Sequence, residues 1–282
     1  TVVKGDGDHV WPIVIADCVA GNLKEEYDGG RVEGAALSKA RWDLMPPKGY
    51  MWASVQTVRG CPKHCSFCSV WRTDGQQPRQ RSNFPVMEEI VELRRLGYRF
   101  IALADDNFYP VTLTDLALAK KQGNEERLAE LTRMRQERFE LMDQLAELPD
   151  DMVFFTQITM EAAEDVEFLK RMRAARIRGG LVGVEAVTEA GLKSVFKDFN
   201  LSGENLIHRL KQFREYDVHV LGSFIFGLPS DREETFKATS DLAIRANLTF
   251  AQFVMMTPFP GTVDFGRWEK SFNGDVPMVE GV

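Results

Sequence analysis

Three of the four cysteines in this 282-residue chain lie within eight residues, at Cys61, Cys65 and Cys68. This spacing is too tight for an ordinary disulfide framework and indicates metal or cluster ligation. Three thiolates can hold three irons of a [4Fe–4S] cubane, which leaves the fourth iron open to another molecule. A cluster closed by a fourth cysteine would serve electron transfer instead. The motif therefore predicts an open iron–sulfur cluster.

A structural zinc site is the alternative use of these cysteines. His64 or Cys18 would then supply the fourth ligand. Zinc sites are usually built from two cysteine pairs, and the sequence contains no second pair. Cys18 falls in a predicted apolar helix over 12–20, where we expect a buried core thiol. A non-catalytic iron–sulfur or zinc module for electron transfer or assembly stays open at this point.

The segments around the cysteine loop predict an α/β fold. From about residue 52, strand-like runs alternate with helix-like runs, the pattern of parallel strands joined by helical crossovers. The predicted strands are 53–59, 99–104, 152–158, 180–185, 218–226 and 249–256. Six strands rather than eight predict a partial (β/α)6 barrel. The cysteines directly follow the first strand, where barrel enzymes assemble their active sites.

The net charge and the hydropathy of the chain indicate which kind of substrate to expect and where in the cell the protein is located. A net charge of -7 argues against a nucleic-acid footprint, which needs clustered Lys and Arg, so we expect a small-molecule or lipid substrate. No apolar run approaches the length of about 18–20 residues that a membrane span needs, and no signal peptide opens the chain. We expect a cytoplasmic protein, at the membrane periphery if the substrate is a lipid. The charged segment 112–147 is predicted to be a solvated helical insertion.

The Cys-x-x-x-Cys-x-x-Cys loop, with Phe67 before its last cysteine, resembles the signature of the radical S-adenosylmethionine superfamily. The resemblance spans residues 52 to about 262 and implies a partial barrel. It also implies that the open iron binds the amino and carboxylate groups of S-adenosylmethionine. Reductive cleavage would then yield a 5′-deoxyadenosyl radical that abstracts hydrogen from an unactivated carbon. A flavodoxin or ferredoxin would donate the electron.

The same resemblance assigns cofactor contacts at the ends of predicted strands two and four. Asp105 and Asp106 stand where the family places polar groups near the methionine amino group, and carboxylates suit an ammonium. Glu185, which ends the fourth strand, corresponds to the residue that accepts the ribose hydroxyls. Phe67 is expected to pack on the adenine ring.

The last two strands carry further matches. Gly222 and Gly227 lie in a segment that resembles the family's fifth-strand motif, whose backbone runs beside the adenine. Pro258 belongs to the loop that resembles the family's closing segment. Arg79 and Arg81, after the cysteine loop, are either charge partners of the cofactor or solvated surface arginines.

Residues 1–35 resemble the last strand and helix of the cobalamin-binding domain that precedes many barrels of this type. The chain begins with Thr inside an apolar run, so we expect a fragment whose cobalamin domain lies mainly upstream, with 36–51 as linker and 52–282 as barrel. None of the four histidines stands in an Asp-x-His-x-x-Gly setting that would mark a lower cobalt ligand. The implied mechanism uses one S-adenosylmethionine to methylate cobalamin and a second to generate the radical.

The segments 184–188, 197–200 and 250–264 are most similar to the hopanoid C-3 methylase branch of the family. This similarity implies a C-methyltransferase that acts on a lipid. Met255, Met256 and Phe259 would form an apolar mouth for a triterpenoid, although such residues serve equally well as ordinary barrel core. Tetrapyrrole cyclisation and methylthio transfer remain alternative reactions of the same cluster chemistry.

Overall fold

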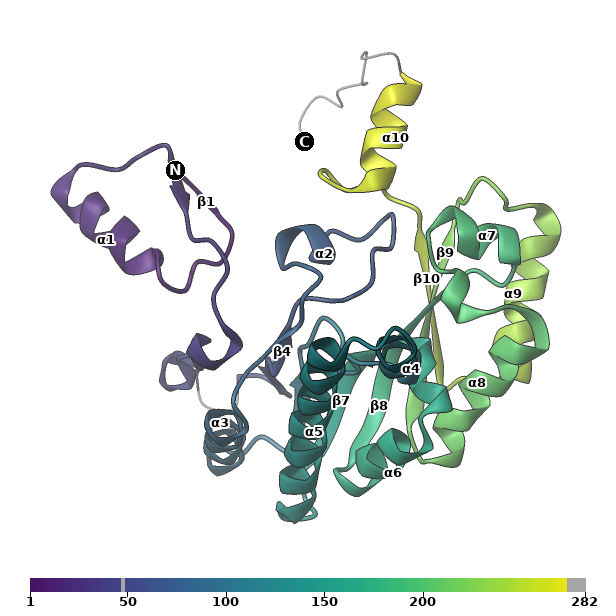
Figure 1. The fold of residues 1–282 in the computed structure, drawn as a ribbon, viewed down its shortest axis with the longest axis horizontal. Helices are drawn as coiled ribbons and strands as arrows, with labels where there is room; N and C mark the ends of the chain where they lie inside the picture. Colours follow the sequence, from purple (N-terminus) through teal and green to yellow (C-terminus); the bar gives the residue numbers. More distant parts are fainter. Residues whose placement is uncertain (47–48, 273–282) are drawn as a thin grey trace.

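Six parallel strands form the main sheet of the computed structural model, which describes residues 1–46 and 49–272 (Figure 1). The strands are β3 (Ala53–Val55), β6 (Phe100–Leu103), β7 (Val153–Ile158), β8 (Ile177–Glu185), β9 (His219–Phe226) and β10 (Phe250–Met255). Their order in the sheet follows their order in the chain, and β3 and β10 form its two open edges. The predicted partial (β/α)6 barrel is confirmed. Pro47 and Lys48 of the predicted linker and residues 273–282 of the predicted barrel lie outside the described residues.

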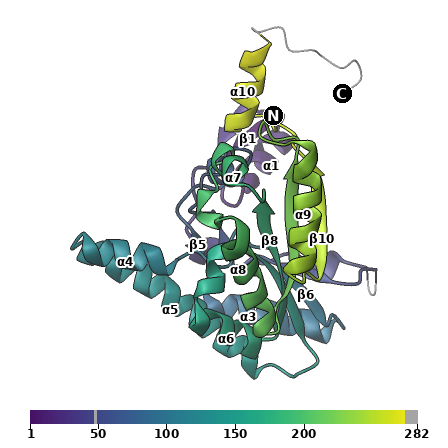
Figure 2. The same ribbon diagram turned by 90° about the vertical axis from the view of Figure 1, so that its right-hand side faces the viewer.

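Helices connect successive strands and cover the outer face of the sheet (Figures 1 and 2). They are α3 (Asn83–Arg95), α5 (Glu125–Glu147), α6 (Val166–Ala174), α8 (Gly203–Glu215) and α9 (Glu233–Arg245). Each presents an apolar stripe to the strands; in α3 the buried stripe is Val86, Ile90 and Leu93, at helical spacing. The main core therefore lies between the helices and the sheet, and the concave face of the sheet is left for a site.

The predicted insertion at 112–147 folds as two helices, α4 (Leu113–Lys121) and α5, which project from the barrel in Figure 2. Thr112 begins α4 with a capping box to Asp115, and Asn124 caps α5. The prediction of a solvated insertion holds only for the projecting part. Further along α5, Leu141 and Met142 are buried in the main core.

The amino-terminal unit consists of β1 (Val2–Lys4), α1 (Trp11–Ala20) and β2 (Glu26–Asp28), and its two strands pair in parallel. Val14 is the only buried residue of α1, and it packs with Tyr27 of β2. Cys18 is exposed, so the prediction of a buried core thiol is wrong. The physical reason is that nothing among the described residues packs on the face of α1 that carries Cys18.

The predicted strand 53–59 divides in two. After β3 the chain leaves the main sheet, and β4 (Val58–Arg59) pairs antiparallel with β5 (Arg79–Gln80). We call this two-stranded base of the cysteine loop the neck. The predicted linker contributes Trp42 to the main core. No helix in the described ranges is long and apolar enough to cross a membrane.

The remaining elements are short. They are the helices α2 (Val70–Thr73), α7 (Glu189–Ser194) and α10 (Val263–Ser271), and the 3₁₀ turns Gly34–Ala36, Trp42–Leu44, Met160–Glu164 and Asp198–Asn200. Figure 1 shows α2 and α10 on the same side of the sheet as the cysteine loop.

Candidate functional site

The base of the cysteine loop is closed by backbone hydrogen bonds. The N–H of Cys61 donates to the carbonyl of Gly75 at 3.0 Å. Gly60, the preceding residue, has a φ of 94°, which glycine adopts without strain. Its N–H donates to a carboxylate oxygen of Asp106 at 2.6 Å. This turn brings the first cysteine to the carboxyl end of β6.

Two further contacts hold the middle of the loop. The indole N–H of Trp71, in α2, donates to the carbonyl of Cys65 at 3.0 Å. The hydroxyl of the buried Ser66 donates to Asp264 at 2.7 Å, and the N–H of Asp264 donates back to the carbonyl of Ser66 at 3.2 Å. Asp264 lies in the first turn of α10, which Thr262 caps. The last helix thus helps to fix the loop that carries the cysteines.

A cavity of about 650 Å³ opens beside this loop, at the carboxyl ends of the parallel strands. Side chains from the loop and from the ends of β6, β7, β8, β9 and β10 line it. Its polar wall includes Cys61, Cys65, Cys68, Asp106, Glu185 and Lys197. Its apolar wall includes Phe67, Ile225, Val254, Met255, Met256 and Phe259. In barrel enzymes this end of the sheet carries the catalytic groups.

All three cysteines of the loop line the cavity. Burial raises the pKa of Cys61 to about 11, and it also raises the pKa of Cys65 and of Cys68 above the ordinary thiol value. A thiolate in such surroundings needs a bound metal, which deprotonates a coordinating thiol outright. Three soft sulfur donors on one short loop therefore fit an iron–sulfur cluster.

The zinc alternative finds less support in the geometry. His64 is exposed and Cys18 lies in the amino-terminal unit, and neither lines the cavity. Within residues 1–46 and 49–272, no group of three or more His, Cys, Asp or Glu forms a site for a single metal ion. A cubane spreads its three thiolates over three irons, so it does not require the cysteines to surround one ion.

Glu185 and Lys197 form a buried ion pair in the cavity wall. Nζ of Lys197 lies 2.7 Å from Oε1 of Glu185 and donates to the carbonyl of Gly183 at 2.8 Å. A Cβ atom on Gly183 would lie 2.2 Å from that Oε1 and 2.3 Å from Nζ, so glycine makes room for the pair. Burial alone would lower the pKa of Lys197, but the facing carboxylate raises it.

Lys197 did not stand out as a site residue in the sequence. It lies in the short loop that follows α7, where no local pattern distinguishes a buried lysine from an exposed one. The structure shows that the side chain is nearly inaccessible and forms part of the cavity. Glu185, which was predicted as a site residue, has a φ of 66°, a backbone conformation that non-glycine residues rarely adopt.

The two predicted aspartates take different positions. Asp106 lines the cavity, as the predicted contact with an ammonium requires. Asp105 is 1% exposed and does not line it. Its carboxylate accepts hydrogen bonds from the N–H groups of Thr57 and Val58 in the neck, the latter at 2.9 Å. The predicted cofactor contact of Asp105 is corrected to a role in holding the neck.

Arg138 of α5 supports Asp105 from the other side of the neck. Its guanidinium is buried and donates to Thr57 Oγ1 at 2.6 Å and to Gln80 at 3.0 Å. We expect Arg138→Met to lower the free energy of unfolding by about 2–3 kcal/mol, because Asp105 then stays buried without its nearest cation. Arg133→Met removes an exposed cation of the same helix and should cost about 0.5 kcal/mol or less. Urea denaturation of both variants checks this; equal losses would contradict it.

Phe67 lies half-buried in the cavity wall and packs against the small cluster that contains Ile225 and Leu228. The other predicted adenine neighbours do not line the cavity. A Cβ atom on Gly222 would meet Leu248 at 2.8 Å, so this glycine packs closely away from the cavity, and Ser223 is the cavity residue beside it.

Gly227 turns the chain after β9 with a φ of 95°, and its N–H donates to Asp231 at 2.8 Å. Pro258 lies between Thr257 and Phe259, both of which line the cavity although Pro258 does not. Gly222, Gly227 and Pro258 therefore lie beside the cavity and not in its wall, and their cofactor contacts stay predictions. Glycine and proline mark this region in the sequence, but they do not show which neighbouring side chains point into the cavity.

Part of the apolar wall of the cavity is open to solvent. Met255 is 70% exposed and Phe259 is 60% exposed, whereas Val254 and Met256 are half-buried and pack with the cluster around Ile225. Met255, Met256 and Phe259 are therefore not ordinary barrel core. Exposed apolar side chains gathered at the mouth of a cavity are typical of a binding surface.

Comparison with known proteins adds to this picture. The chain is 22% identical over 279 residues to the bacteriochlorophyllide d C-8(2)-methyltransferase of Chlorobaculum tepidum, covering 96% of this chain and 58% of that protein. It is 23% identical over 234 residues to the hopanoid C-2 methylase of Rhodopseudomonas palustris, covering 81% of this chain and 40% of that protein. The chain thus spans about half the length of the curated relatives it matches.

Among solved structures, the methyltransferase TsrM from Kitasatospora setae superposes with a TM-score of 0.71 at 17% identity, covering 98% of this chain and 55% of that chain. This likeness shows a shared fold. The model of the radical SAM superfamily matches residues 55–243, which contain the cysteine loop and four of the cavity-lining strand ends. Because that match covers more than half of the chain, the protein belongs to the radical SAM superfamily.

Proposed function

We propose that this chain holds a [4Fe–4S] cluster on Cys61, Cys65 and Cys68 and methylates an unactivated carbon of a large apolar substrate. The observation that carries the proposal is that one cavity is lined both by the three cysteines with polar side chains and by a set of apolar side chains. The polar wall lies beside the cysteines and suits S-adenosylmethionine. The apolar wall, which exposes Met255 and Phe259, suits a substrate with little polar surface.

Residues of the polar wall have separate roles in this proposal. A bound cluster supplies the electron that cleaves S-adenosylmethionine. Asp106 attracts the methionine ammonium, since a carboxylate is the natural partner of that cation. Glu185 accepts hydrogen bonds from the ribose hydroxyls, and Lys197 holds its carboxylate in place. Phe67, which belongs to the apolar wall, provides a surface for the adenine ring.

The apolar wall favours a lipid-like or other extended apolar substrate. The apolar wall includes two flexible thioethers, Met255 and Met256, and one aromatic ring, Phe259, beside Val254. Flexible thioethers adapt to a bulky hydrocarbon surface. The name of the first relative indicates a bacteriochlorophyllide substrate, and the name of the second indicates a hopanoid substrate. We assign a hopanoid-like substrate to this chain. A cytoplasmic location and a flavodoxin or ferredoxin as electron donor complete the proposal.

Cobalamin use also belongs to this proposal. Cobalamin, when bound, carries a methyl group from one S-adenosylmethionine to the substrate. A TsrM structure from Kitasatospora setae that shares this fold is described as cobalamin-bound. The β1–α1–β2 unit is parallel, and its helix exposes four large apolar side chains, Trp11, Ile13, Ile15 and Val19. An exposed apolar helix face of this kind is expected at one end of a larger α/β domain.

The test is product analysis with S-adenosylmethionine that carries a deuterated methyl group. Cluster-loaded chain is incubated anaerobically with hydroxocobalamin, dithionite and a hopanoid. The proposal predicts a product with the labelled methyl group, together with equal amounts of S-adenosylhomocysteine and 5′-deoxyadenosine. Oxidation or ring closure without the label would indicate cyclase chemistry. A product that gains sulfur would indicate methylthio transfer.

A further inference from the structure

The neck of the cysteine loop brings two arginines together. β4 and β5 pair antiparallel, and Arg59 stands directly opposite Arg79. Like charges at directly opposed positions of two strands destabilise the pairing. Arg59 is separated from Cys61 by a single residue, so any displacement of the neck would also move the first cysteine. The neck therefore needs an anion to hold it.

Asp6 of the amino-terminal unit supplies that anion. Its carboxylate is 3% exposed, lies 3.2 Å from Nη1 of Arg59, and also accepts a hydrogen bond from Nη1 of Arg79. The N–H of Val32 donates to the same carboxylate at 2.7 Å. Asp8 adds a second contact, 2.8 Å from Nη1 of Arg59. Neither neck arginine faces the cofactor cavity, and Arg79 is not a solvated surface residue.

The backbone around Asp6 is held as firmly as its side chain. Its N–H donates to the carbonyl of Gly30 at 3.0 Å, and the N–H of Gly29 donates to the carbonyl of Lys4 at 2.8 Å. A Cβ atom on Gly29 would lie 1.8 Å from the carbonyl oxygen of Asp6, so the two turns can approach only because this residue is glycine. The carboxylate is therefore presented from a fixed position.

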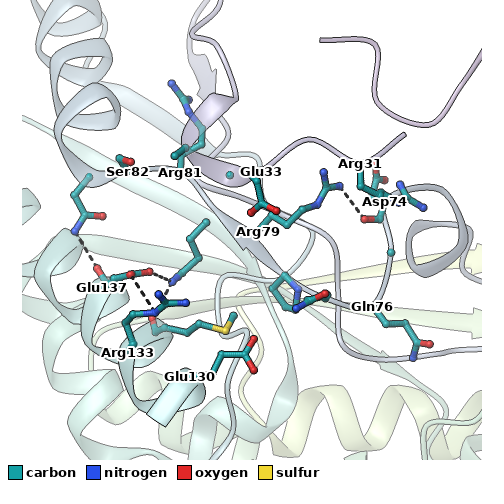
Figure 3. A pocket seen from close by; sticks show the side chains of 18 of the residues that line it. Arg31, Glu33, Asp74, Gln76, Arg79, Arg81, Ser82, Glu130, Arg133 and Glu137 are labelled. Carbon is teal, nitrogen blue, oxygen red and sulfur yellow. Dashed lines mark hydrogen bonds and ion pairs between the residues drawn. The ribbon is translucent and has the colours of Figure 1, made fainter. Parts of the chain in front are cut away.

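A series of hydrogen bonds connects Asp6 through Arg79 to the backbone beside Cys61. Nη2 of Arg79 donates to the carbonyl of Asp74 at 2.9 Å, and the next carbonyl, that of Gly75, accepts from the N–H of Cys61 at 3.0 Å. Figure 3 shows Arg79 beside Asp74 in a polar cavity of about 700 Å³. Asp105 and Arg138 hold the neck from one side, and the ion pairs of Asp6 hold it on the side that borders the polar cavity.

We propose that Asp6 is a positioning residue for the cluster, since it clamps Arg59 and Arg79 and thereby fixes both ends of the cysteine loop. Asp6 lies outside the residues matched by the family model, which begin at 55. The inference rests on the proposed assignment of the three cysteines as cluster ligands. It makes the amino-terminal unit a part of the cluster site.

The test compares Asp6→Asn with Glu26→Gln in the 282-residue chain. Both changes remove one carboxylate from the amino-terminal unit, but Glu26 forms only an exposed pair with Lys4. After anaerobic reconstitution, we expect Asp6→Asn to retain iron about tenfold less tightly than the parent chain. The electron paramagnetic resonance spectrum of its reduced cluster should also change. Glu26→Gln should match the parent chain in both measurements.

A second measurement needs no cluster. Hydrogen–deuterium exchange of the metal-free chain should be faster in Asp6→Asn for the peptides that contain 58–62 and 74–81, and unchanged in Glu26→Gln. If Asp6→Asn does not fold, the double variant with Asp6→Asn and Arg79→Gln replaces it. This double variant removes the clamp without leaving Arg79 unpaired, and it should show the same faster exchange. Unchanged exchange in the neck would overturn the inference. If the parent chain takes up no cluster, the cysteine assignment fails, and the exchange result still decides on the clamp.

Discussion

Replacing Cys65 by alanine should abolish cluster binding. Two thiolates cannot hold the cubane, and no other Cys in the described part of the chain lies near the loop, because Cys18 belongs to the amino-terminal unit. Cys65 is also the most buried of the three cysteines, and its carbonyl accepts the indole N–H of Trp71. We expect iron and acid-labile sulfide to fall to background after anaerobic reconstitution and desalting.

Cys18→Ala is the matched control for this variant. Cys18 is exposed on α1 and lines no part of the cavity, so its loss should leave the iron content and the visible absorption of the cluster unchanged. Equal iron loss in the two variants would contradict the ligand assignment. Retention of iron by Cys65→Ala would contradict it as well.

Lys197→Met should both destabilise the protein and stop cleavage of S-adenosylmethionine. The substitution leaves the carboxylate of Glu185 buried without its cation, and breaking a buried pair in this way costs about 3–5 kcal/mol. The carboxylate then has no partner to hold it at the end of β8. We expect a lower free energy of unfolding in urea and no 5′-deoxyadenosine above background.

A double variant separates the two effects. Glu185→Gln together with Lys197→Met removes both charges and should recover most of the lost stability, because no unpaired charge stays buried. It should not recover cleavage, since the amide that replaces the carboxylate is a weaker, neutral acceptor with a single oxygen and Lys197 no longer holds it in place. Lys193→Met, which breaks an exposed pair with Glu189, should cost about 0.5 kcal/mol or less and leave cleavage intact. Full cleavage by the double variant would contradict the proposed role of the pair.

The order of the strands could be predicted from the sequence because each strand carries its own local signal. Apolar and β-branched runs alternate with amphipathic segments, and right-handed crossovers allow few arrangements of six parallel strands. The place of the cysteines followed from the same pattern, because they come directly after the first strand. The fold and the location of the cavity at the strand ends could therefore be predicted from local sequence patterns.

The direction of individual side chains could not be predicted in this way. Asp105 and Asp106 are neighbours in the chain, yet only Asp106 lines the cavity. Gly222 lies on the far side of its strand from Ser223 for the same reason, since alternate residues of a strand face opposite sides. The alternation is also interrupted between β3 and β4, where Thr57 and Val58 contact Arg138 and Asp105, far along the chain.

Isolated charged residues gave the weakest signal. Lys197 and Asp6 are both nearly buried, but a charged residue in a loop predicts a solvated side chain, and nothing in the neighbouring residues indicates otherwise. Their partners, Glu185 for the first and Arg59 and Arg79 for the second, are brought to them only by the tertiary fold. Cys18 shows the reverse error. Its apolar helix predicts a buried thiol, but the thiol is exposed because no described residue covers that face of α1.

The most direct test of the central claim is the anaerobic cleavage of S-adenosylmethionine. The chain is reconstituted with iron and sulfide, reduced with dithionite, mixed with S-adenosylmethionine, and assayed by chromatography for 5′-deoxyadenosine. The structure predicts that 5′-deoxyadenosine forms and that its formation depends on each of Cys61, Cys65 and Cys68. Zinc in place of iron, or a cluster-loaded chain that yields no 5′-deoxyadenosine, would contradict the account.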